Sequence, residues 1–438
     1  MRGEDSAPRD RVPLRRITAD QIPTATLPAP DPHTEATVAS ILDDVRSRGS
    51  DAVRDHARAL GDLGSDDPWI YPRSRLDEAL DGLDGSDRNL LMRLGERIRH
   101  FARRQLDAFS EMETPFPGGV AGHRITPLAT AGCYAPGGRF PLPSTVMMTV
   151  VTARVAGVAN VWVASPKPTQ VTLAAAAAAD ADALLAVGGA QAIGAFAYGA
   201  GEVPACDVVV GPGNRWVTAA KALISPAVRI DVLAGPSELT ILADRASDPE
   251  LVAADLLAQA EHDPDARSVL VSTSPELIAA VEVELARQLR DLPTALVASA
   301  SLERGVAVPI RDLAEGIDIC NRIAPEHLQV HVADPGAVVE RLTNFGALFV
   351  GERSSHVFGD YGAGPNHVLP TSAAARATSG LSVLSFLKVT TWLQLSGEPE
   401  GDQLVEDAAR LARLEGLEAH ARAADLRAGP RRIAREPR

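Results

Sequence analysis

The stretch Val158-Ala-Asn-Val-Trp-Val-Ala164 is a short, almost continuous apolar run in the middle of the chain. Comparable runs stand at residues 183–187, 208–210, 230–233 and 239–242, and alanine-rich helical segments separate them. Strands buried on both faces have this character, and their alternation with helices is typical of parallel βαβ layers. The sequence therefore predicts an α/β fold built on parallel sheets.

A second series of apolar runs, at residues 269–272, 296–297 and 348–350, predicts further strands, so two α/β bodies fit better than one. We expect two Rossmann-like α/β domains, each an incomplete dinucleotide fold, with small helical N- and C-terminal extensions. The expected boundaries are an N-terminal arm at 1–32, a discontinuous first domain at 33–130 and 239–381, a second domain at 131–238, and a C-terminal helical extension at 382–438.

Composition excludes several classes of partner. The 438 residues carry a formal net charge of -14, and an acidic surface repels nucleic acid and anionic membranes. The first ten residues lack the apolar core of a signal peptide, and Asp180 and Asp182 interrupt the most apolar region, so no bilayer span is expected. We predict a cytoplasmic protein that handles a small molecule.

The cysteines point to a reducing compartment. Cys133, Cys206 and Cys320 are widely spaced and form no Cys-x-x-Cys pair. Cys133 precedes a glycine-rich turn and could act as a nucleophile, but a small apolar filler is the favoured interpretation.

A metal site is predicted from two separated segments. Gln259 and His262 stand three apart at the end of a helix that Asp248 or Ser247 caps and Pro249 begins, so both side chains share one face. Asp360 follows on a glycine-rich loop and is a third candidate ligand. A nitrogen and oxygen donor set without thiolate suits catalytic zinc or a similar metal.

A fourth ligand is sought near the C-terminus, where residues 411–422 read as a helix with one histidine, His420. Glu415 lies five residues before it, so the two side chains occupy different parts of the helix surface. An ordinary surface helix with inward-facing leucines explains the same pattern.

The dipeptide Glu326-His327 pairs a carboxylate with an imidazole. An imidazole titrates near neutrality and can take an alcohol proton, while a carboxylate can activate water. Such a pair is more often surface decoration, so the dipeptide by itself is weak evidence.

Several glycine-rich turns follow the apolar runs, at residues 135–138, 188–191, 211–214 and 234–237. Turns at the carboxyl ends of parallel strands receive nucleotides, because their backbone N–H groups are free to meet phosphate. None completes the G-x-G-x-x-G fingerprint, since Trp216 stands where its third glycine belongs. Plain tight turns therefore stay open as an alternative.

Six separated motifs make the chain similar to the histidinol dehydrogenase family, in order from about Pro127 to Arg427. They are Ala234-Gly-Pro-Ser-Glu238, Asp255-Leu-Leu-Ala-Gln-Ala-Glu-His-Asp-Pro264, Arg322-Ile-Ala-Pro-Glu-His-Leu-Gln329, residues 359–371, Ser379-Gly-Leu-Ser-Val383 and residues 415–422. The match departs from the family in two places: upstream of about residue 120 it reduces to a loose helical pattern, and the stretch Ser354-Ser-His-Val-Phe358 is not distinctive.

The resemblance implies a zinc- and NAD-dependent enzyme that oxidises L-histidinol to L-histidine through the aldehyde. It implies that His327 takes the alcohol proton, that Glu326 activates water, and that the domain at 131–238 binds NAD through Tyr134, Gln191 and Asn214. It also implies a homodimer with shared sites, in which His420 completes the zinc shell across the interface. The implied zinc ligands are Gln259, His262, Asp360 and His420, and the implied substrate contacts are Ser237, Gln259, His262, His327, Asp360, Glu415 and His420.

The remaining histidines are given lesser roles. His367 is expected near the site as a hydrogen-bonding group. His331, His356 and four others have no companion at ligand spacing and are interpreted as solvated or structurally bonded. The alternatives for function are a related NAD-dependent dehydrogenase of another amino alcohol or polyol, a zinc hydrolase without nucleotide, and a non-catalytic small-molecule binding protein.

Overall fold

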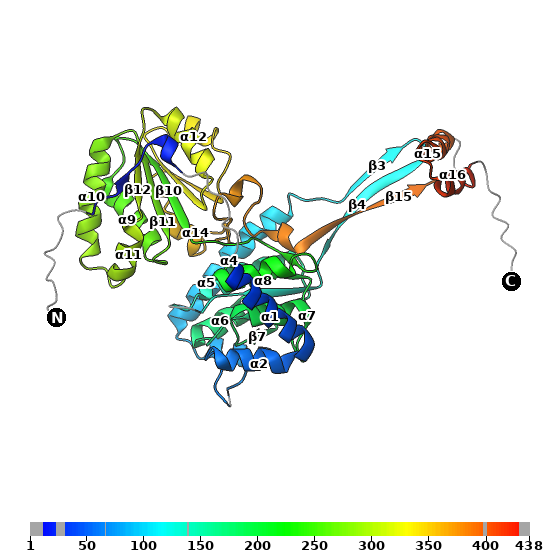
Figure 1. Ribbon diagram of the computed structural model, residues 1–438, viewed down its shortest axis with the longest axis horizontal. Coiled ribbons are helices and arrows are strands. Elements are labelled where there is room, and N and C mark those ends of the chain that lie inside the picture. Colours follow the sequence, from blue (N-terminus) through cyan, green and yellow to red (C-terminus); the bar gives the residue numbers. More distant parts are fainter. Residues whose placement is uncertain (1–11, 23–30, 66, 138–139, 397–400, 429–438) are drawn as a thin grey trace. The chain divides into compact units, whose positions relative to one another are not determined.

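The computed structural model describes residues 12–22, 31–65, 67–137, 140–396 and 401–428. The chain divides into two compact units (Figure 1). Unit 1 comprises Met1–Leu106 and Leu128–Phe386, and unit 2 comprises Asp107–Pro127 and Leu387–Arg438. Unit 1 holds two six-stranded sheets, called sheet A and sheet B below, and unit 2 holds a three-stranded sheet.

Sheet A has the order β1-β12-β11-β10-β13-β14, and all of its neighbouring strands run parallel. Its strands are β1 (Arg15–Arg16), β10 (Glu238–Ala243), β11 (Arg267–Ser272), β12 (Val306–Pro309), β13 (His327–His331) and β14 (Ala347–Val350). Its helices are α9 (Pro249–Ala260), α10 (Pro275–Leu289), α11 (Ala295–Leu302), α12 (Leu313–Ile323), α13 (Gly336–Val339) and α14 (His356–Asp360).

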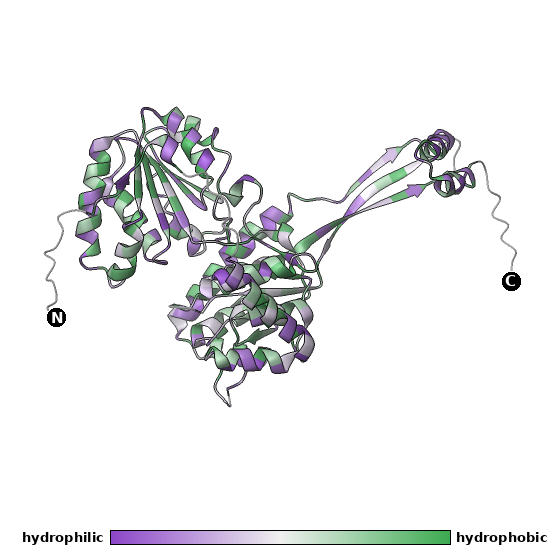
Figure 2. Ribbon diagram, viewed as in Figure 1, coloured by the Kyte–Doolittle hydropathy of each residue, from purple (hydrophilic) through white to green (hydrophobic). Residues whose placement is uncertain are grey.

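Two consecutive residues of β10 show why sheet A needs helices on both faces. Ile241 packs into a core with residues of α9, α10 and α11, whereas the next residue, Leu242, packs with residues of α12 and α13. Both side chains are completely buried. The apolar character of the strand follows from burial on two sides, and Figure 2 colours the central strands mostly green.

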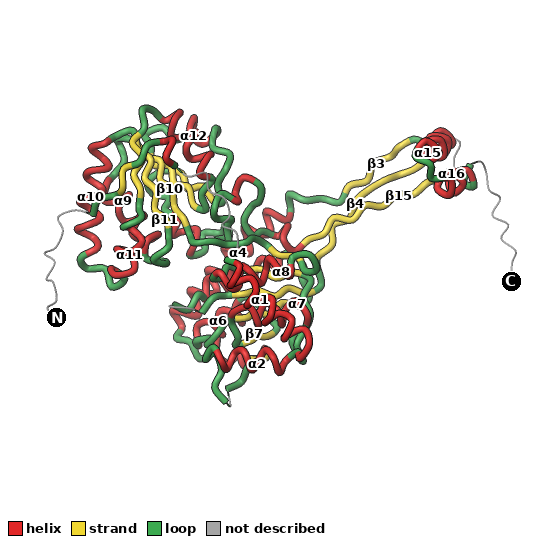
Figure 3. The backbone as a smooth tube through the Cα atoms, in the orientation of Figure 1, coloured by secondary structure: helices red, strands yellow, loops and turns green. Residues whose placement is uncertain are grey.

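Sheet B has the order β2-β7-β6-β5-β8-β9, parallel except for the edge strand β2. Its strands are β2 (Ile70–Pro72), β5 (Thr130–Tyr134), β6 (Asn160–Ala164), β7 (Ala183–Leu185), β8 (Val208–Val210) and β9 (Arg229–Ile230). Helices flank the strands in Figure 3: α1 (Pro32–Arg48), α2 (Ser50–Ala59), α3 (Arg73–Asp81), α4 (Gly85–Leu106), α5 (Pro143–Val155), α6 (Gln170–Ala178), α7 (Gly189–Tyr198) and α8 (Arg215–Ile224). The prediction of parallel α/β architecture is confirmed, but the strand expected at 296–297 is wrong, because these residues belong to helix α11.

The N-terminal helices and the expected arm belong to other sheets than the expected domain boundaries assigned them to. Helix α1 packs on α7 and α8, and α3 and α4 pack on α6 and α5, so the helices before residue 107 cover sheet B. The predicted first domain had joined residues 33–130 to 239–381, whose strands form sheet A. Residues of the expected arm supply strand β1, which pairs with β12. Local periodicity predicts helices, but the sheet that they cover is chosen by long-range packing.

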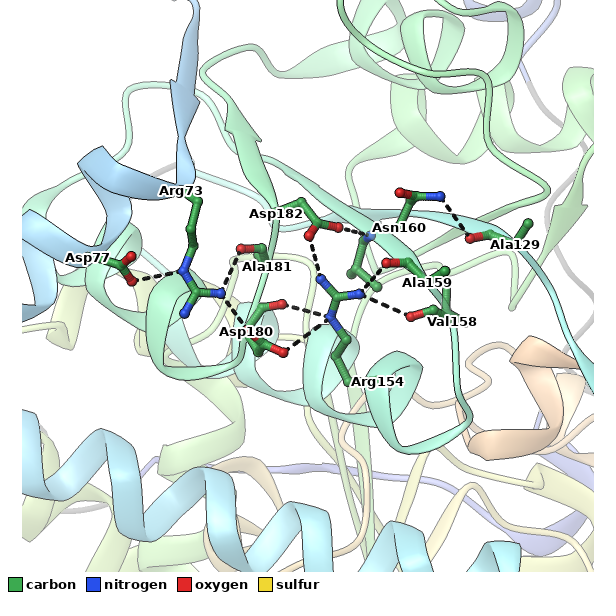
Figure 4. A network of polar contacts seen from close by, with 11 residues as sticks. Arg73, Asp77, Ala129, Arg154, Val158, Ala159, Asn160, Asp180, Ala181 and Asp182 are labelled. Carbon is green, nitrogen blue, oxygen red and sulfur yellow. Dashed lines mark hydrogen bonds and ion pairs between the residues drawn. The ribbon is translucent and has the colours of Figure 1, made fainter.

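The amino ends of β6 and β7 are held by a network of paired charges (Figure 4). Arg154 donates to the carbonyl oxygens of Val158, Ala159 and Asp180 at 2.7–3.0 Å and contacts Asp182 at 2.9 Å. Arg73 pairs with Asp180 at 2.5 Å. Every charge drawn there has a partner, so this edge of sheet B is structural.

Unit 2 is an antiparallel sheet followed by two helices. Its strands are β3 (Met112–Phe116), β4 (Gly119–Pro127) and β15 (Leu387–Leu395), in the order β15-β4-β3. Helices α15 (Asp402–Leu414) and α16 (Glu418–Asp425) pack on each other. Leu411, Leu414 and Leu417 are exposed, which contradicts the inward packing considered for these leucines. Within the described residues, no helix has the length and apolarity needed to cross a bilayer.

Candidate functional site

The last turn of α9 carries Gln259, but the helix ends at Ala260, so His262 lies just beyond it and not on it as predicted. The helix begins as expected, with Asp248 accepting a hydrogen bond as its cap and Pro249 at its first position. Gln259 is completely buried, and neither atom of its side-chain amide has a hydrogen-bond partner among the described residues. His262 follows the end of the helix, with its side chain 42% exposed. A buried amide without partners is costly unless a ligand satisfies it.

Asp360 lies at the end of α14, a short helix capped by Ser355, and not on a loop as predicted. Its Oδ2 lies 3.9 Å from Nε2 of His262, and its Oδ1 lies 3.5 Å from Nε2 of His327. Burial by itself would raise the pKa of Asp360, but His327 outweighs it and lowers that pKa to about 2. The structure thus places an ionised carboxylate between two imidazoles.

His356 lies on the same short helix and was missed by the sequence analysis. One donor atom from each of His262, His356 and Asp360 falls in a group whose members are all within 4.8 Å of one another. Burial lowers the pKa of His356 to about 3, so its ring is neutral. The signal was present, because His356 and Asp360 are four residues apart and therefore share a helix face. The expectation of a loop concealed it.

Glu326 and His327 are buried where β13 begins, so they are not surface decoration. Glu326 Oε2 accepts hydrogen bonds from Ser237 Oγ at 2.5 Å and from the backbone N–H of Glu238 at 2.9 Å. Burial raises the pKa of Glu326, although the nearby His327 and these two donors oppose the shift.

His327 lies between two carboxylates. Its Nδ1 is 3.7 Å from Glu326 Oε2, and its Nε2 faces Asp360. Burial disfavours the charged ring, but the two carboxylates prevail and raise the pKa of His327 to about 9. In the metal-free protein the ring of His327 is therefore protonated at neutral pH.

Glu238 is a further buried carboxyl group that sequence reasoning did not single out. Burial and the neighbouring Glu326 raise its pKa to about 7. Its Oε1 accepts a hydrogen bond from the backbone N–H of Ser372. No local pattern distinguishes this residue, because its neighbours come from distant segments.

His367 has the hydrogen-bonding role that was expected of it. Its Nδ1 lies 2.9 Å from the carbonyl oxygen of Asp360, and its Nε2 lies 3.1 Å from Oγ1 of Thr145 in α5. Since an oxygen that can only accept faces Nδ1, the hydrogen belongs on Nδ1. His367 thus links the segment of Asp360 to a helix of sheet B.

The residues at this site suit a borderline divalent cation. The unpaired amide of Gln259, the ionised Asp360 and the exposed imidazole of His262 are oxygen and nitrogen donors of the kind that catalytic zinc takes. The carboxyl-terminal end of α9, with its partial negative charge, adds a favourable field for a cation.

The residues predicted to bind the dinucleotide lie at the carboxyl edge of sheet B. Tyr134 ends β5, and its hydroxyl oxygen accepts a hydrogen bond from the backbone N–H of Gly189 at 3.2 Å. Gln191 is completely buried, and its amide has no partner among the described residues. Asn214 is exposed and caps α8. Strands β5 and β8 flank the point where strand order reverses, the usual location of a nucleotide.

Gly211 shows how closely the backbone approaches at this edge. It has φ +112, and a Cβ atom there would lie 1.9 Å from the carbonyl oxygen of Tyr134. Only glycine is compatible with both conditions.

Two other predicted features have different outcomes. Cys133 is completely buried, and burial raises the pKa of its thiol to about 12, so it is a packed filler and not a nucleophile. Glu415 ends α15 and His420 lies in α16, both exposed and both on unit 2. Their participation in the site stays a prediction.

Comparison with known proteins agrees with these observations. The model of the family described as histidinol dehydrogenase matches residues 28–428. The histidinol dehydrogenase of Thermus thermophilus is 48% identical over 399 residues, which cover 91% of this chain and 95% of that protein. That of Nitrosospira multiformis is 41% identical and covers 91% of each. A crystal structure of histidinol dehydrogenase from Elizabethkingia anophelis superposes with a TM-score of 0.86 at 28% identity and covers 94% of both chains. The chain therefore belongs to the histidinol dehydrogenase family and is an enzyme of the dehydrogenase class.

Proposed function

We propose that the chain oxidises L-histidinol to L-histidine in two successive NAD-linked steps through the aldehyde, as the last step of histidine biosynthesis. The observation that carries the proposal is the buried pair Glu326 and His327 beside Asp360, whose other carboxylate oxygen faces His262. Oxidation of an amino alcohol needs a base for the hydroxyl proton, and a cation can position the substrate; this site has candidates for both.

His327 serves the alcohol step by taking the hydroxyl proton while the carbon loses a hydride. A base must be neutral to accept a proton, and the pKa of His327 is raised to about 9. This value belongs to the metal-free protein, and zinc bound to Asp360 would lower it, so the rate of the alcohol step is expected to rise with pH as His327 loses its proton.

Glu326 serves the aldehyde step by taking a proton from the water that attacks the carbonyl carbon. The donors Ser237 Oγ and Glu238 N–H both bind Oε2, so they fix the carboxylate and leave Oε1 for the water. The raised pKa of Glu326 makes it a better proton acceptor than an exposed glutamate. Loss of a second hydride from the resulting hydrate yields the carboxylate.

Two bound groups complete the proposal. Zinc would be held by Gln259, His262, Asp360 and His420, and when bound it would grip the imidazole and amine of histidinol and so position the reacting carbon. NAD would be held by Tyr134, Gln191 and Asn214 and would accept one hydride in each step. The buried, unpartnered amides of Gln259 and Gln191 support these assignments.

The decisive assay mixes the purified, zinc-loaded chain with NAD and histidinol and follows NADH absorbance and histidine formation. We expect two NADH for each histidine, and NADH also from the aldehyde. Other amino alcohols and polyols serve as controls. Faster turnover of one of them would identify a related dehydrogenase, while ester or amide cleavage without NADH would identify a zinc hydrolase.

We further propose a homodimer in which His420 and Glu415 complete the site of the second copy. The support is their position on a compact unit of its own, far in sequence from the other ligands. Mixing inactive His262→Ala with inactive His420→Ala chains should restore activity, up to about half of the wild-type value for each mixed dimer. Without recovery, after subunit exchange is verified by mass, His420 would have to act within its own chain.

We also infer a cytoplasmic location. Cys133, Cys206 and Cys320 are free and buried, as suits a reducing compartment.

A further inference from the structure

The orientation of His356 is determined by Gln329, a buried residue of β13. An amide is oriented by its hydrogen bonds. The backbone N–H of His356 lies 2.8 Å from one atom of the Gln329 amide and can only donate, so that atom is the oxygen. The amide nitrogen then faces two acceptors, Asp255 Oδ2 at 2.8 Å and His331 Nε2 at 3.1 Å.

The same amide oxygen decides which ring nitrogen of His356 carries the hydrogen. It lies 3.0 Å from Nδ1 of His356, and an oxygen that only accepts requires the hydrogen on Nδ1. The neutral ring then has its free lone pair on Nε2. That atom is buried and has no hydrogen-bond partner among the described residues.

The ring of His356 lies close to the donor atoms of the metal site. His356 contributes one donor to the group with His262 and Asp360 in which all distances are within 4.8 Å. Nδ1 is already occupied by Gln329, so Nε2 is the atom available for this role. Donors on opposite sides of one zinc ion lie about 4.2 Å apart, given bond lengths of about 2.1 Å. A small rotation of the exposed His262 side chain closes the difference.

The surroundings of His356 have the arrangement that supports metal-bound histidines. Such a histidine usually donates its other ring N–H to a carbonyl or carboxylate, which fixes the tautomer and the ring. Here the Gln329 oxygen accepts that hydrogen bond, and Asp255 holds the amide from the other side. Ser355, the cap of α14, donates to Asp255 Oδ1 at 2.6 Å and ties the helix to the same cluster.

A purely structural role leaves the lone pair without a partner. The ring of His356 lies 5.3 Å from the ring of His327, tilted by 52°, but no hydrogen bond between them is found in the described part of the chain. The hydrogen bond to Gln329 satisfies Nδ1 and sets the tautomer, but it leaves the buried lone pair on Nε2 unused.

We propose that Nε2 of His356 is an additional protein ligand of the metal in the substrate-free enzyme, beside His262 and Asp360. The proposal rests on the zinc site proposed above. It adds a ligand from α14, the short helix that also carries Asp360. The ligand set of this chain then contains one imidazole more than its resemblance to the family implies.

The test compares two buried histidines that both touch Gln329, namely His356 and His331. His356→Asn and His331→Asn are purified, stripped of metal and reloaded with Zn²⁺ or Co²⁺. In competition with a chelator, His356→Asn should bind zinc about 100-fold more weakly, whereas His331→Asn should change by less than about 10-fold. The visible spectrum of bound Co²⁺ should change in position and intensity for His356→Asn alone, because only that variant alters the donor set.

The outcomes separate this proposal from the zinc site itself. A folded His356→Asn with wild-type zinc affinity and Co²⁺ spectrum overturns the role of His356. If that variant does not fold, X-ray absorption of the zinc-loaded wild type decides by the number of bound imidazoles: three support the proposal, and two, from His262 and His420, overturn it. Stoichiometric zinc in His262→Ala would instead show that the metal lies elsewhere, whatever His356 does.

Discussion

The two parallel sheets of unit 1 use opposite edges for their candidate sites. In sheet A the chemical groups lie at the amino edge. Helix α9 ends there just before His262, which faces Asp360, and α12 ends there just before Glu326. In sheet B the predicted dinucleotide residues lie at the carboxyl edge, where α7 and α8 begin. Carboxyl ends of helices thus lie at the candidate site of sheet A, and amino ends of helices lie at that of sheet B.

Helix polarity gives this difference a physical reason. The carboxyl end of a helix carries a partial negative charge and favours cations, whereas its amino end carries free N–H groups and favours anions. A zinc ion suits the first edge, and the pyrophosphate of NAD suits the second. Helix polarity therefore agrees with the proposed placement of the two cofactors at different edges.

The amino edge of sheet B offers a second contrast, since the charges in the network around Arg154 are all paired with one another (Figure 4). At the two candidate sites, by comparison, the amides of Gln259 and Gln191 are buried without partners in the described structure. The paired groups stabilise the fold, whereas the unpaired amides of Gln259 and Gln191 are available to bind a ligand.

The largest expected effect is loss of turnover without loss of zinc, from substitutions of Glu326 and His327 at the amino edge of sheet A. Glu326→Gln should lower overall turnover by about 10²- to 10⁴-fold, with the aldehyde step affected at least as much as the alcohol step. His327→Asn should slow chiefly the alcohol step. Both half-reactions are measured separately by NADH formation, with zinc content as the control. Equal, small effects of both variants on both steps would remove the pair from the mechanism.

Gln259→Leu tests whether the unpaired amide is there for a metal. We expect the variant to lose most of its zinc while keeping NAD binding, because the second edge is untouched. In the metal-free protein it should be more stable than wild type by about 1–3 kcal/mol, since a buried unsatisfied amide is removed. Zinc analysis and urea unfolding measure both effects.

Arg154→Leu is the opposite control for that experiment. It breaks paired hydrogen bonds, so it should destabilise the protein by about 1–3 kcal/mol with or without zinc. A Gln259→Leu variant that is destabilised in the same way without metal would mean that its amide has partners in solution.

Gln191→Leu is the matching change at the carboxyl edge of sheet B. The variant should bind NAD about 10-fold more weakly and keep its full zinc content. Its metal-free stability should again not fall, because Gln191 is as buried and as unpaired as Gln259. Titration with NAD and zinc analysis test the pair. Loss of zinc from Gln191→Leu would contradict the assignment of the two edges.

The smallest expected effect concerns Glu238, whose pKa rises from 4.5 in the unfolded chain to about 7 in the folded one. Between these values the folded state binds more protons, so stability falls as pH rises from about 4.5 to 7 and stays lower above that. Glu238→Gln removes this loss. The variant should gain about 1–2 kcal/mol over wild type at pH 8 and much less at pH 4.5. An equal gain at both pH values, in urea unfolding of the metal-free protein, would show that Glu238 does not titrate in this range.

Sequence alone determined the class of fold and much of the site. Apolar runs such as residues 208–210 and 239–242 predicted buried parallel strands, because burial on both faces leaves no polar alternation. The cap Asp248 and Pro249 predicted the start of the helix that carries Gln259. These features depend on neighbours in sequence, so a local pattern is enough to predict them.

Tertiary structure alone decided which distant segments meet. The helices before residue 107 cover sheet B and not sheet A, because the choice depends on apolar faces that only long-range packing brings together. Glu238 acquires its shifted pKa from Glu326 and from burial, and His356 acquires its tautomer from Gln329. A residue's ionisation and hydrogen-bond partners depend on neighbours in space, so the sequence around it does not contain them.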